Sequence, residues 1–385
     1  KPREAWEYLA RDGVRSCGVG ATMFVATMFV ATAVVIAASP DHLVVLQHGL
    51  YGGASNLAVL RQHLVGIGGE NVLVHLASAN EGRTRDGVAA GGRRLAAEIR
   101  SVAASAPSLE SLSLVGNSLG GLYVRAAAAE LYGGGQQELG LAPNTLVTTG
   151  CPHLGVRRYT YLPLPPALHS LGGLVAGRTA SDLLLRRTDA DPRPPLLVEM
   201  ADPDSRYGVA LRSFQRRRLY ANLRGDFMVP FGTAAIETGG WAAGVGDGCL
   251  VERFAARQDV VFRDVEVCGG RADGIGVVCE QRPTLERTEE GVDGAEWEEE
   301  MRAGLSAVAW DKVGVSFRAA GTLTPLAHNK LPALRREGWR RAFEWVEQAQ
   351  EGVPVMEDAA RFVVGGRGEE SARRKATTGR EASAS

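Results

Sequence analysis

A serine set between glycines is the strongest chemical signal in this sequence. The motif GNSLG at residues 116–120 has the form G-x-S-x-G, with an apolar strand-like run before it and an Ala-rich helix-like stretch after it. A nucleophilic serine must project from a tight strand-to-helix turn, which leaves room only for small residues two positions to either side. Gly116 and Gly120 meet this need. The pattern therefore predicts a nucleophile elbow carrying Ser118, and a plain glycine-rich turn is the alternative.

A second glycine-rich motif, HGLYGG at residues 48–53, also follows a strand-like run. In acyl transfer, the negative oxygen of the tetrahedral intermediate must be met by two backbone N–H groups. One comes from the residue after the serine, Leu119. The other comes from the loop after an early strand, which the sequence places at Leu50, with Tyr51 as the alternative. We expect His48 to brace this loop by hydrogen bonding and to take no part in the chemistry.

The serine needs a base, and the order of residues along the chain narrows the choice. In folds with such an elbow, the acid follows the serine and the histidine follows the acid. Of the seven histidines, only His153, His169 and His328 come after Ser118. His153 comes too early to leave room for an acid-bearing strand, and His169 lies in a proline-rich stretch. His328, after the last predicted strand, is the predicted base.

The predicted acid is Asp226, which follows the strand-like run Leu219–Leu223 and a glycine turn. This position would expose the carboxylate at the carboxyl edge of a parallel sheet. There it would orient the imidazole and stabilise its protonated form. The rival candidates, none of which follows the end of a predicted strand, are Asp202, Asp204, Asp247 and Asp264.

Strand-like runs alternate with helix-like stretches through a predicted domain at residues 41–352. Strands separated by helices pair in parallel through crossovers, so the expected class is α/β, a mostly parallel central sheet with flanking helices. The stretch Val156–Arg218 has no sheet rhythm and is expected to be an inserted, cap-like segment, or ordinary packing over the sheet. The predicted strands and helices are Leu43–Gln47, Asn71–Leu76, Leu112–Val115, Leu146–Thr149, Leu219–Leu223, Val313–Phe317, and Gly87–Val102, Leu122–Leu131, Leu334–Ala349.

Composition limits the other classes of protein. The 385 residues are 45% hydrophobic with a net charge of -1, which is typical of a globular chain without a field that would attract nucleic acid. The five cysteines form no CxxC pair, so neither a disulfide framework nor a zinc site is predicted. The acidic stretch Glu286–Glu300 lacks the spacing of a calcium loop. We expect no metal and no organic cofactor.

The two ends of the chain differ in character. Residues 1–40 contain the uncharged apolar run Cys17–Ala38, which is long enough to span a bilayer. It has two interpretations: a single membrane anchor whose basic flank stays in the cytoplasm, or a buried or low-complexity insertion. Residues 353–385 are expected to form a largely disordered tail, since the stretch Gly365–Ser385 is polar and mixed in charge.

Taken in order, these motifs resemble a known family. The segments HGLYG, GNSLGGLYVR, TTGCPHLG, LYANLRGDFMVP and AHNK occur as in the DUF676 serine esterases, an α/β-hydrolase lipase family, and the likeness spans Asp41–Ala349. The resemblance implies an α/β-hydrolase fold with Ser118, Asp226 and His328 as the catalytic triad. One departure is Asn117, where many relatives carry histidine.

The resemblance also implies the activity of a lipase or esterase. Such an enzyme cleaves acyl esters of glycerolipids through an acyl-enzyme intermediate. Two alternatives stay open: a thioesterase or protein deacylase that uses this triad, and a non-catalytic α/β-hydrolase scaffold. The expected partners are a lipid or acyl-ester substrate and a membrane or lipid-droplet surface, with no nucleic acid. The expected location is the cytoplasm or a membrane.

Overall fold

The computed structural model describes residues 39–134, 139–157, 177–187, 193–222, 226, 228–237, 249–254, 260–266, 291–317, 327–334 and 352–365. All of them belong to one compact unit, Ala38–Ser385. Three predicted features lie wholly or largely outside the described residues: the apolar run Cys17–Ala38, the first part of the cap-like segment and the helix Leu334–Ala349.

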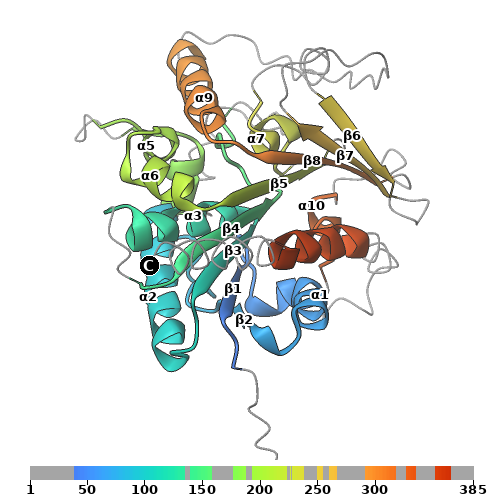
Figure 1. Cartoon of the computed structure of the whole chain (residues 1–385). Helices are drawn as coiled ribbons and strands as arrows, with labels where there is room; N and C mark the ends of the chain where they lie inside the picture. The colour runs from blue at the N-terminus through green and yellow to red at the C-terminus, as the bar shows by residue number, and fades with distance from the viewer. Residues whose placement is uncertain are drawn as a thin grey trace, which may run out of the picture. The chain divides into compact units, whose positions relative to one another are not determined.

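An eight-stranded sheet runs through this unit in the order β2-β1-β3-β4-β5-β8-β7-β6 (Figure 1). The strands from β2 to β8 in this order are parallel, and β7 and β6 add antiparallel pairs at one edge. The predicted α/β class with a mostly parallel sheet is therefore confirmed. The strands are β1 (His42–Gln47), β2 (Val72–Leu76), β3 (Ser111–Asn117), β4 (Ala142–Thr149), β5 (Arg216–Asn222), β6 (Cys249–Phe254), β7 (Val260–Glu266) and β8 (Asp311–Phe317).

Both faces of the sheet are covered, which explains the continuous apolar run Leu43–Leu46 in β1. In β1, Leu43 and Val45 pack into one hydrophobic core, and Val44 and Leu46 pack into the other. Successive side chains of a strand point to opposite faces, so a strand covered on both sides needs apolar residues at every position.

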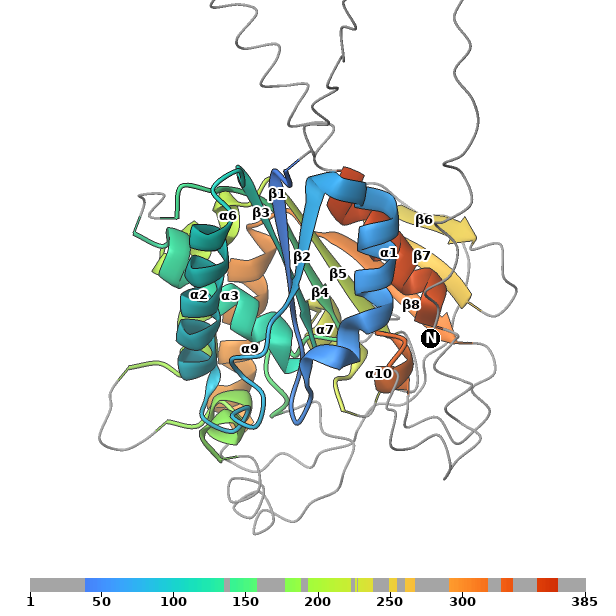
Figure 2. The same cartoon turned by 90° about the horizontal axis from the view of Figure 1, so that it is seen from below.

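Helices form a layer on each face (Figure 2). Helix α1 (Ala58–Gly68) and the helical residues 353–365 contribute to one core. Helices α2 (Val88–Ser105) and α3 (Leu119–Tyr132) contribute to the other. The remaining helices are η1 (Ala54–Leu57), η2 (Gly69–Asn71), α5 (Leu196–Ala201), α6 (Arg206–Ser213), α7 (Phe231–Ala235), α9 (Gly291–Ser306) and α10 (Ala327–Lys330).

The prediction that residues 353–385 form a largely disordered tail is wrong for residues 353–365. These residues are helical, and Val355, Met356, Ala359 and Val363 on one helix face are fully buried in the core that α1 also lines. The apolar spacing is that of an amphipathic helix, whereas the prediction weighed only the polar stretch that follows. The domain therefore extends past the predicted boundary at residue 352, and residues 366–385 lie outside the described part.

Polar contacts hold this C-terminal helix against β5. Asp358 accepts hydrogen bonds from the Tyr220 hydroxyl at 2.6 Å and from Arg218 Nη1 at 3.1 Å. The guanidinium of Arg218 also lies 3.9 Å from the centre of the Phe362 ring. The helix is thus fixed to the sheet by charge as well as by apolar burial.

The cap-like segment Val156–Arg218 is partly described. Residues 177–183 are helical, α5 and α6 follow, and β5 begins at Arg216 within the predicted segment. The sequence also did not predict α1, β6, β7 or α9. Over the described ranges, no helix has the length and apolar character that crossing a membrane requires.

Candidate active site

Three side chains from distant parts of the chain meet at the carboxyl edge of the parallel strands. Ser118 follows β3, Asp226 follows β5 and His328 lies in α10. The Nε2 atom of His328 is 2.9 Å from Ser118 Oγ, and its Nδ1 atom is 2.8 Å from Asp226 Oδ2. All three residues are buried. A serine hydroxyl, an imidazole and a carboxylate are therefore joined in one hydrogen-bonded chain, the arrangement that nucleophilic catalysis by serine uses.

The serine sits on a strained turn. Ser118 has φ 56° and ψ −129°, a conformation that costs free energy for a residue with a side chain. Its amide donates to the Thr149 carbonyl at 2.8 Å, which ties the turn to the end of β4. A Cβ atom on Gly116 would overlap the backbone of Gly120, and one on Gly120 would overlap the Gln47 carbonyl. Close backbone packing is thus the reason for glycine at both positions.

The loop after β1 lies directly against the serine. A Cβ atom on Gly49 would be 2.7 Å from Ser118 Cβ and 3.3 Å from Ser118 Oγ. Leu50 comes next, and Leu119 opens α3, where the first amides of a helix have no intrahelical acceptor. The loop and the helix N-terminus therefore flank the serine hydroxyl, as an oxyanion site requires.

The structure distinguishes the two predicted donors in this loop. The Tyr51 amide donates to the Thr84 hydroxyl oxygen at 3.0 Å and is already engaged. Within the described ranges, the Leu50 amide has no hydrogen-bond acceptor. Leu50 and Leu119 are thus the better pair for an oxyanion. His48 is buried and its Nδ1 donates to the Gly49 carbonyl at 3.0 Å, which fits the expected bracing role.

Asp226 is held by a set of hydrogen bonds that the sequence did not reveal. Its Oδ2 atom accepts from Asn222 Nδ2 at 2.8 Å, in addition to its contact with the imidazole. Its Oδ1 atom accepts from the Met228 amide at 3.1 Å and the Val229 amide at 2.8 Å. Asn222 is the last residue of β5, and a polar residue directly after the run Leu219–Ala221 was the available signal in the sequence.

Two opposing effects act on the pKa of the His328 imidazole. Burial alone would lower its pKa, but the charge of Asp226 and the hydrogen bond to it raise the pKa above the ordinary value of 6.5. Gly150, with φ 55°, packs beside the ring, because a Cβ atom there would lie 3.2 Å from His328 Cε1. The ring is therefore fixed by packing as well as by its two hydrogen bonds.

The rival base His153 is structural in this fold. It is fully buried, its Nδ1 accepts from Arg125 Nη1 at 3.2 Å, and its Nε2 donates to Thr148 Oγ1 at 2.9 Å. Burial lowers its pKa well below 6.5, and the charges of Arg125 and Lys312 lower it further. Both ring nitrogens are used away from the serine.

The rival acids that the structure describes also lie apart from the hydrogen-bonded chain. Asp202 and Asp204 form an exposed turn before α6, and Asp264 lies within β7. His169 and Asp247 are outside the described residues.

Asn117, the departure from the family pattern, accepts from the Thr149 hydroxyl at 2.8 Å and so points to the end of β4. This contact directs its side chain away from the serine hydroxyl. In the part of the chain that the structure describes, no group of His, Cys, Asp and Glu is arranged for a metal ion.

A parallel sheet with a serine elbow after β3, an aspartate after β5 and a histidine after β8 defines an α/β-hydrolase. The chain belongs to the DUF676 family, described as "Putative serine esterase (DUF676)", whose model matches residues 37–238. The matched range contains Ser118 and Asp226 and ends before His328, so only the structure brings the histidine to the site.

Two yeast proteins are similar to the matched part of the chain. Putative lipase C4A8.10 of Schizosaccharomyces pombe is 33% identical over 210 residues, which is 51% of this chain and 26% of that protein. Putative lipase ROG1 of Saccharomyces cerevisiae is 32% identical over 212 residues, which is 51% of this chain and 28% of that protein. The similar region is therefore only a part of each relative.

Solved structures of low sequence identity are similar too. The RedJ thioesterase of the prodiginine pathway in Streptomyces coelicolor is 18% identical with a TM-score of 0.30, covering 51% of this chain and 71% of its own. Phospholipase PlaB from Legionella pneumophila, solved in complex with thio-NAD, is 17% identical with a TM-score of 0.32, covering 48% of this chain and 38% of its own.

Proposed function

We propose that this protein is a serine hydrolase that cleaves acyl esters of glycerolipids. The observation that carries the proposal is the hydrogen-bonded chain from Ser118 through His328 to Asp226, with contacts of 2.9 and 2.8 Å. An activated serine beside two backbone amides that can receive an oxyanion is the arrangement that acyl transfer needs. The membership of the chain in the DUF676 family supports the same class of reaction.

The mechanism follows from the roles of these groups. Neutral His328 takes the proton of Ser118 as the serine oxygen attacks the ester carbonyl, and Asp226 stabilises the imidazolium that forms. The amides of Leu50 and Leu119 donate to the oxyanion. The tetrahedral intermediate collapses, and the alcohol leaves with the proton from His328. Water then attacks the acyl-enzyme with the same histidine as base and releases the fatty acid.

Apolar side chains beside the site support a lipid substrate. Tyr51, next to the proposed oxyanion donor Leu50, is 55% exposed, and Met228, close to Asp226 in the chain, is 45% exposed. Exposed large apolar residues that adjoin a polar site are suited to contact an acyl chain. The names of the two yeast relatives, both putative lipases, agree with this substrate class.

A fluorophosphonate probe tests the activated serine directly. The wild-type protein should be labelled covalently, and Ser118→Ala should lose labelling while keeping its melting temperature. Equal labelling of the two would place the reactive group elsewhere. A folded wild-type protein that is not labelled would favour a scaffold and contradict the proposal.

A substrate panel tests the ester class. We expect the highest kcat/KM on diacylglycerol and phospholipid esters, measured beside acyl thioesters and acylated peptides of the same chain length. Activity should be unchanged after treatment with EDTA, because the proposed mechanism uses no metal. A clear preference for thioesters or acyl peptides would replace the lipase proposal with the thioesterase or deacylase alternative.

A further inference from the structure

The loop that carries the proposed oxyanion donor is a strained turn. The Gly52 amide donates to the Gly49 carbonyl at 3.1 Å, which closes a turn over Leu50 and Tyr51. Tyr51 is the third residue of this turn and has φ 52°, as in a type II turn, where glycine is preferred. This conformation is unfavourable for a residue with a side chain, so contacts from outside the turn must hold it.

Two such contacts come from the loop between β2 and α2. The Thr84 hydroxyl oxygen accepts from the Tyr51 amide at 3.0 Å. The Glu81 carboxylate accepts from the Ala54 amide at 2.5 Å, just after the turn. Thr84 is only 2% exposed, so little water reaches its hydroxyl to compete for the hydrogen bond with the Tyr51 amide. The strained residue and the end of the turn are thus both held by one neighbouring loop.

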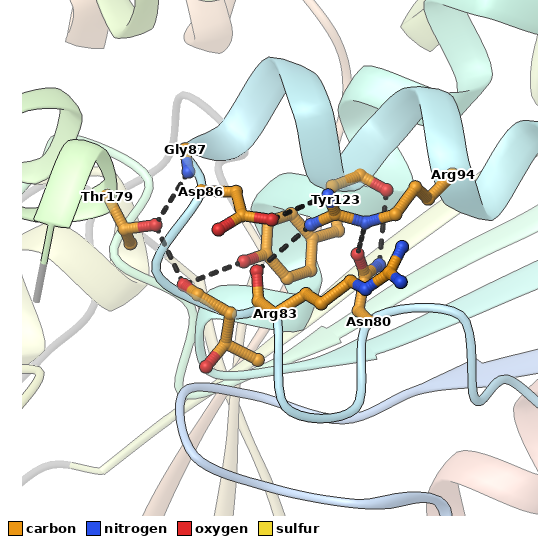
Figure 3. Close-up of polar contacts among 9 residues, drawn as sticks. Asn80, Arg83, Asp86, Gly87, Arg94, Tyr123 and Thr179 are labelled. Carbon is orange, nitrogen blue, oxygen red and sulfur yellow. Dashed lines mark hydrogen bonds and ion pairs between the residues drawn. The ribbon is translucent and has the colours of Figure 1, made fainter.

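Thr84 is itself fixed from two sides, by Tyr123 and by Thr179, both of which are labelled in Figure 3. Its carbonyl accepts from the Tyr123 hydroxyl at 3.1 Å and from Thr179 Oγ1 at 2.7 Å. Tyr123 lies on α3, the helix that begins after Ser118, and Thr179 lies in the predicted cap-like segment. The Gly87 amide donates to Thr179 Oγ1 at 3.0 Å and completes the set. The hydrogen bond from Tyr123 therefore fixes the position of Thr84 relative to α3, the helix that begins directly after Ser118.

The rest of the loop is equally well fixed. Arg94 on α2 donates to Asn80 Oδ1 at 2.9 Å, to Asp86 Oδ2 at 2.8 Å and to the Arg83 carbonyl at 2.9 Å (Figure 3). The Asn80 amide group in turn donates to Gln47 Oε1 at 3.1 Å, at the end of β1. The loop that bears Thr84 is therefore tied to the strand from which the strained turn departs.

From these contacts we propose that Thr84 is a positioning residue for the reaction proposed above. Its hydroxyl holds the Tyr51 amide, which keeps the turn strained and leaves the Leu50 amide directed to the oxyanion. Without the hydroxyl, Tyr51 can relax by rotation of the peptide bond plane between Leu50 and Tyr51, and the turn shifts. The inference rests on the proposed hydrolase function. Because an oxyanion forms only in the transition state, the loss should fall on kcat and not on KM.

The test compares Thr84→Val with Thr84→Ser. Valine keeps the shape and removes the hydroxyl, and we expect kcat for an acyl ester to fall about 10-fold or more, with KM changed less than about 3-fold. Serine keeps the hydroxyl and should restore most of kcat. Thr84→Ala, which adds no atom at the site, should behave like valine. The matched control is Thr145→Val, which removes a buried hydroxyl that donates to Asn144 Oδ1 within β4 and should retain kcat.

A double-mutant cycle separates positioning from general loss of structure. Glycine at position 51 adopts positive φ without strain, so the effect of Thr84→Val should be at least about 3-fold smaller in a Tyr51→Gly background. Equal effects in both backgrounds would overturn the inference. So would a Thr84→Val enzyme with wild-type kcat while Ser118→Ala is inactive, and that result would leave the proposed function intact. A wild-type protein without ester hydrolysis would refute the function itself.

Discussion

At the scale of single residues, the proposed mechanism needs a His328 imidazole that is neutral before it takes the serine proton and is stabilised once it is charged. Burial opposes the charged form, and the Asp226 carboxylate outweighs burial, so the pKa is raised above 6.5. The same carboxylate fixes the tautomer, because Nδ1–H donates to Asp226 and leaves Nε2 to accept the Ser118 proton. Asp226 stays in place because Asn222 and two backbone amides donate to its oxygens.

Replacing Asp226 with asparagine tests this assignment through the pH profile. The base acts when unprotonated, so kcat/KM of the wild type should rise with pH through a His328 pKa above 6.5. Asp226→Asn removes both influences that raise this pKa and leaves burial, which lowers it. We therefore expect the acidic limb to move to lower pH, while kcat falls about 10³- to 10⁴-fold. An unmoved limb with full activity would remove Asp226 from the site.

At the scale of secondary-structure elements, the site is built where strands end and the chain turns with little space. The β1 loop approaches the elbow after β3 so closely that Gly49 contacts the Ser118 side chain. The register pairs Gln47 with Gly116 and Asn117 with Thr149, which brings the ends of β1, β3 and β4 level with one another. Parallel pairing therefore places the loop after β1 and Ser118 at the same edge of the sheet.

Gly49→Ala tests this close approach. The added Cβ atom would lie 2.7 Å from Ser118 Cβ and 3.0 Å from the Asn117 carbonyl oxygen, so the β1 loop must shift. We expect kcat to fall about 100-fold, comparable with the loss of one oxyanion donor, and the free energy of unfolding to fall by about 1–3 kcal/mol.

The matched control for that variant is Gly66→Ala. Gly66 lies in α1, and, apart from its chain neighbours and the backbone of its own helix, no described atom lies within 4 Å of a Cβ placed there. Alanine is favoured over glycine in a helix, so this variant should gain about 0.5–1 kcal/mol and keep its kcat. Wild-type turnover by Gly49→Ala in the same assay would show that the loop tolerates displacement and is not part of an oxyanion site.

At the scale of the whole unit, the sheet needs a layer of helices on each face, and the second face depends on the C-terminal helix. Residues 353–365 supply buried apolar side chains to that face, and Asp358 is hydrogen-bonded to Tyr220 and Arg218 on β5. β5 is also the strand that leads to Asn222 and Asp226. The C-terminal helix thus supports the strand that leads to Asp226, the proposed acid.

Two truncations test this role. A chain ending at residue 351 loses Val355, Met356 and Val363, all fully buried, and leaves the facing core open to water. Each such side chain contributes about 1.5–3 kcal/mol, and the total is comparable with the stability of a domain. We expect no soluble folded protein. A chain ending at residue 366 should melt within a few degrees of the full chain, and equal stability of the two truncations would contradict the proposed role.

Much of the site could be predicted because its strongest signals are local. The elbow around Ser118 occupies consecutive residues, since a strand, a tight turn and a helix must follow one another to expose the hydroxyl. The same holds for Asp226 after a strand-like run and for His328 after the last predicted strand. Each strand of the parallel sheet was also predicted, because each contains a short run rich in apolar residues that burial in the sheet requires.

Local patterns were weaker for elements whose partners are distant. The antiparallel strands β6 and β7 carry charged residues within short runs, such as Glu252-Arg253 and Arg263-Asp264, which hide the strand pattern. The helix of residues 353–365 was missed because its apolar face is short and is followed by a long polar stretch. The two strands and the helix are stabilised by the sheet that they join, which their own local sequence does not show.

By itself, the sequence determined the fold class, and it predicted Ser118 as the nucleophile with the order of the residues that follow it. Only the tertiary structure decided how these residues are held: the Asn222 contact with Asp226, the packing of Gly150 on His328, and the preference for Leu50 over Tyr51. The last depends on Thr84, a residue of another loop. The physical reason is that a turn or a strand is encoded by neighbouring residues, whereas a hydrogen bond between distant loops exists only once the sheet has brought them together.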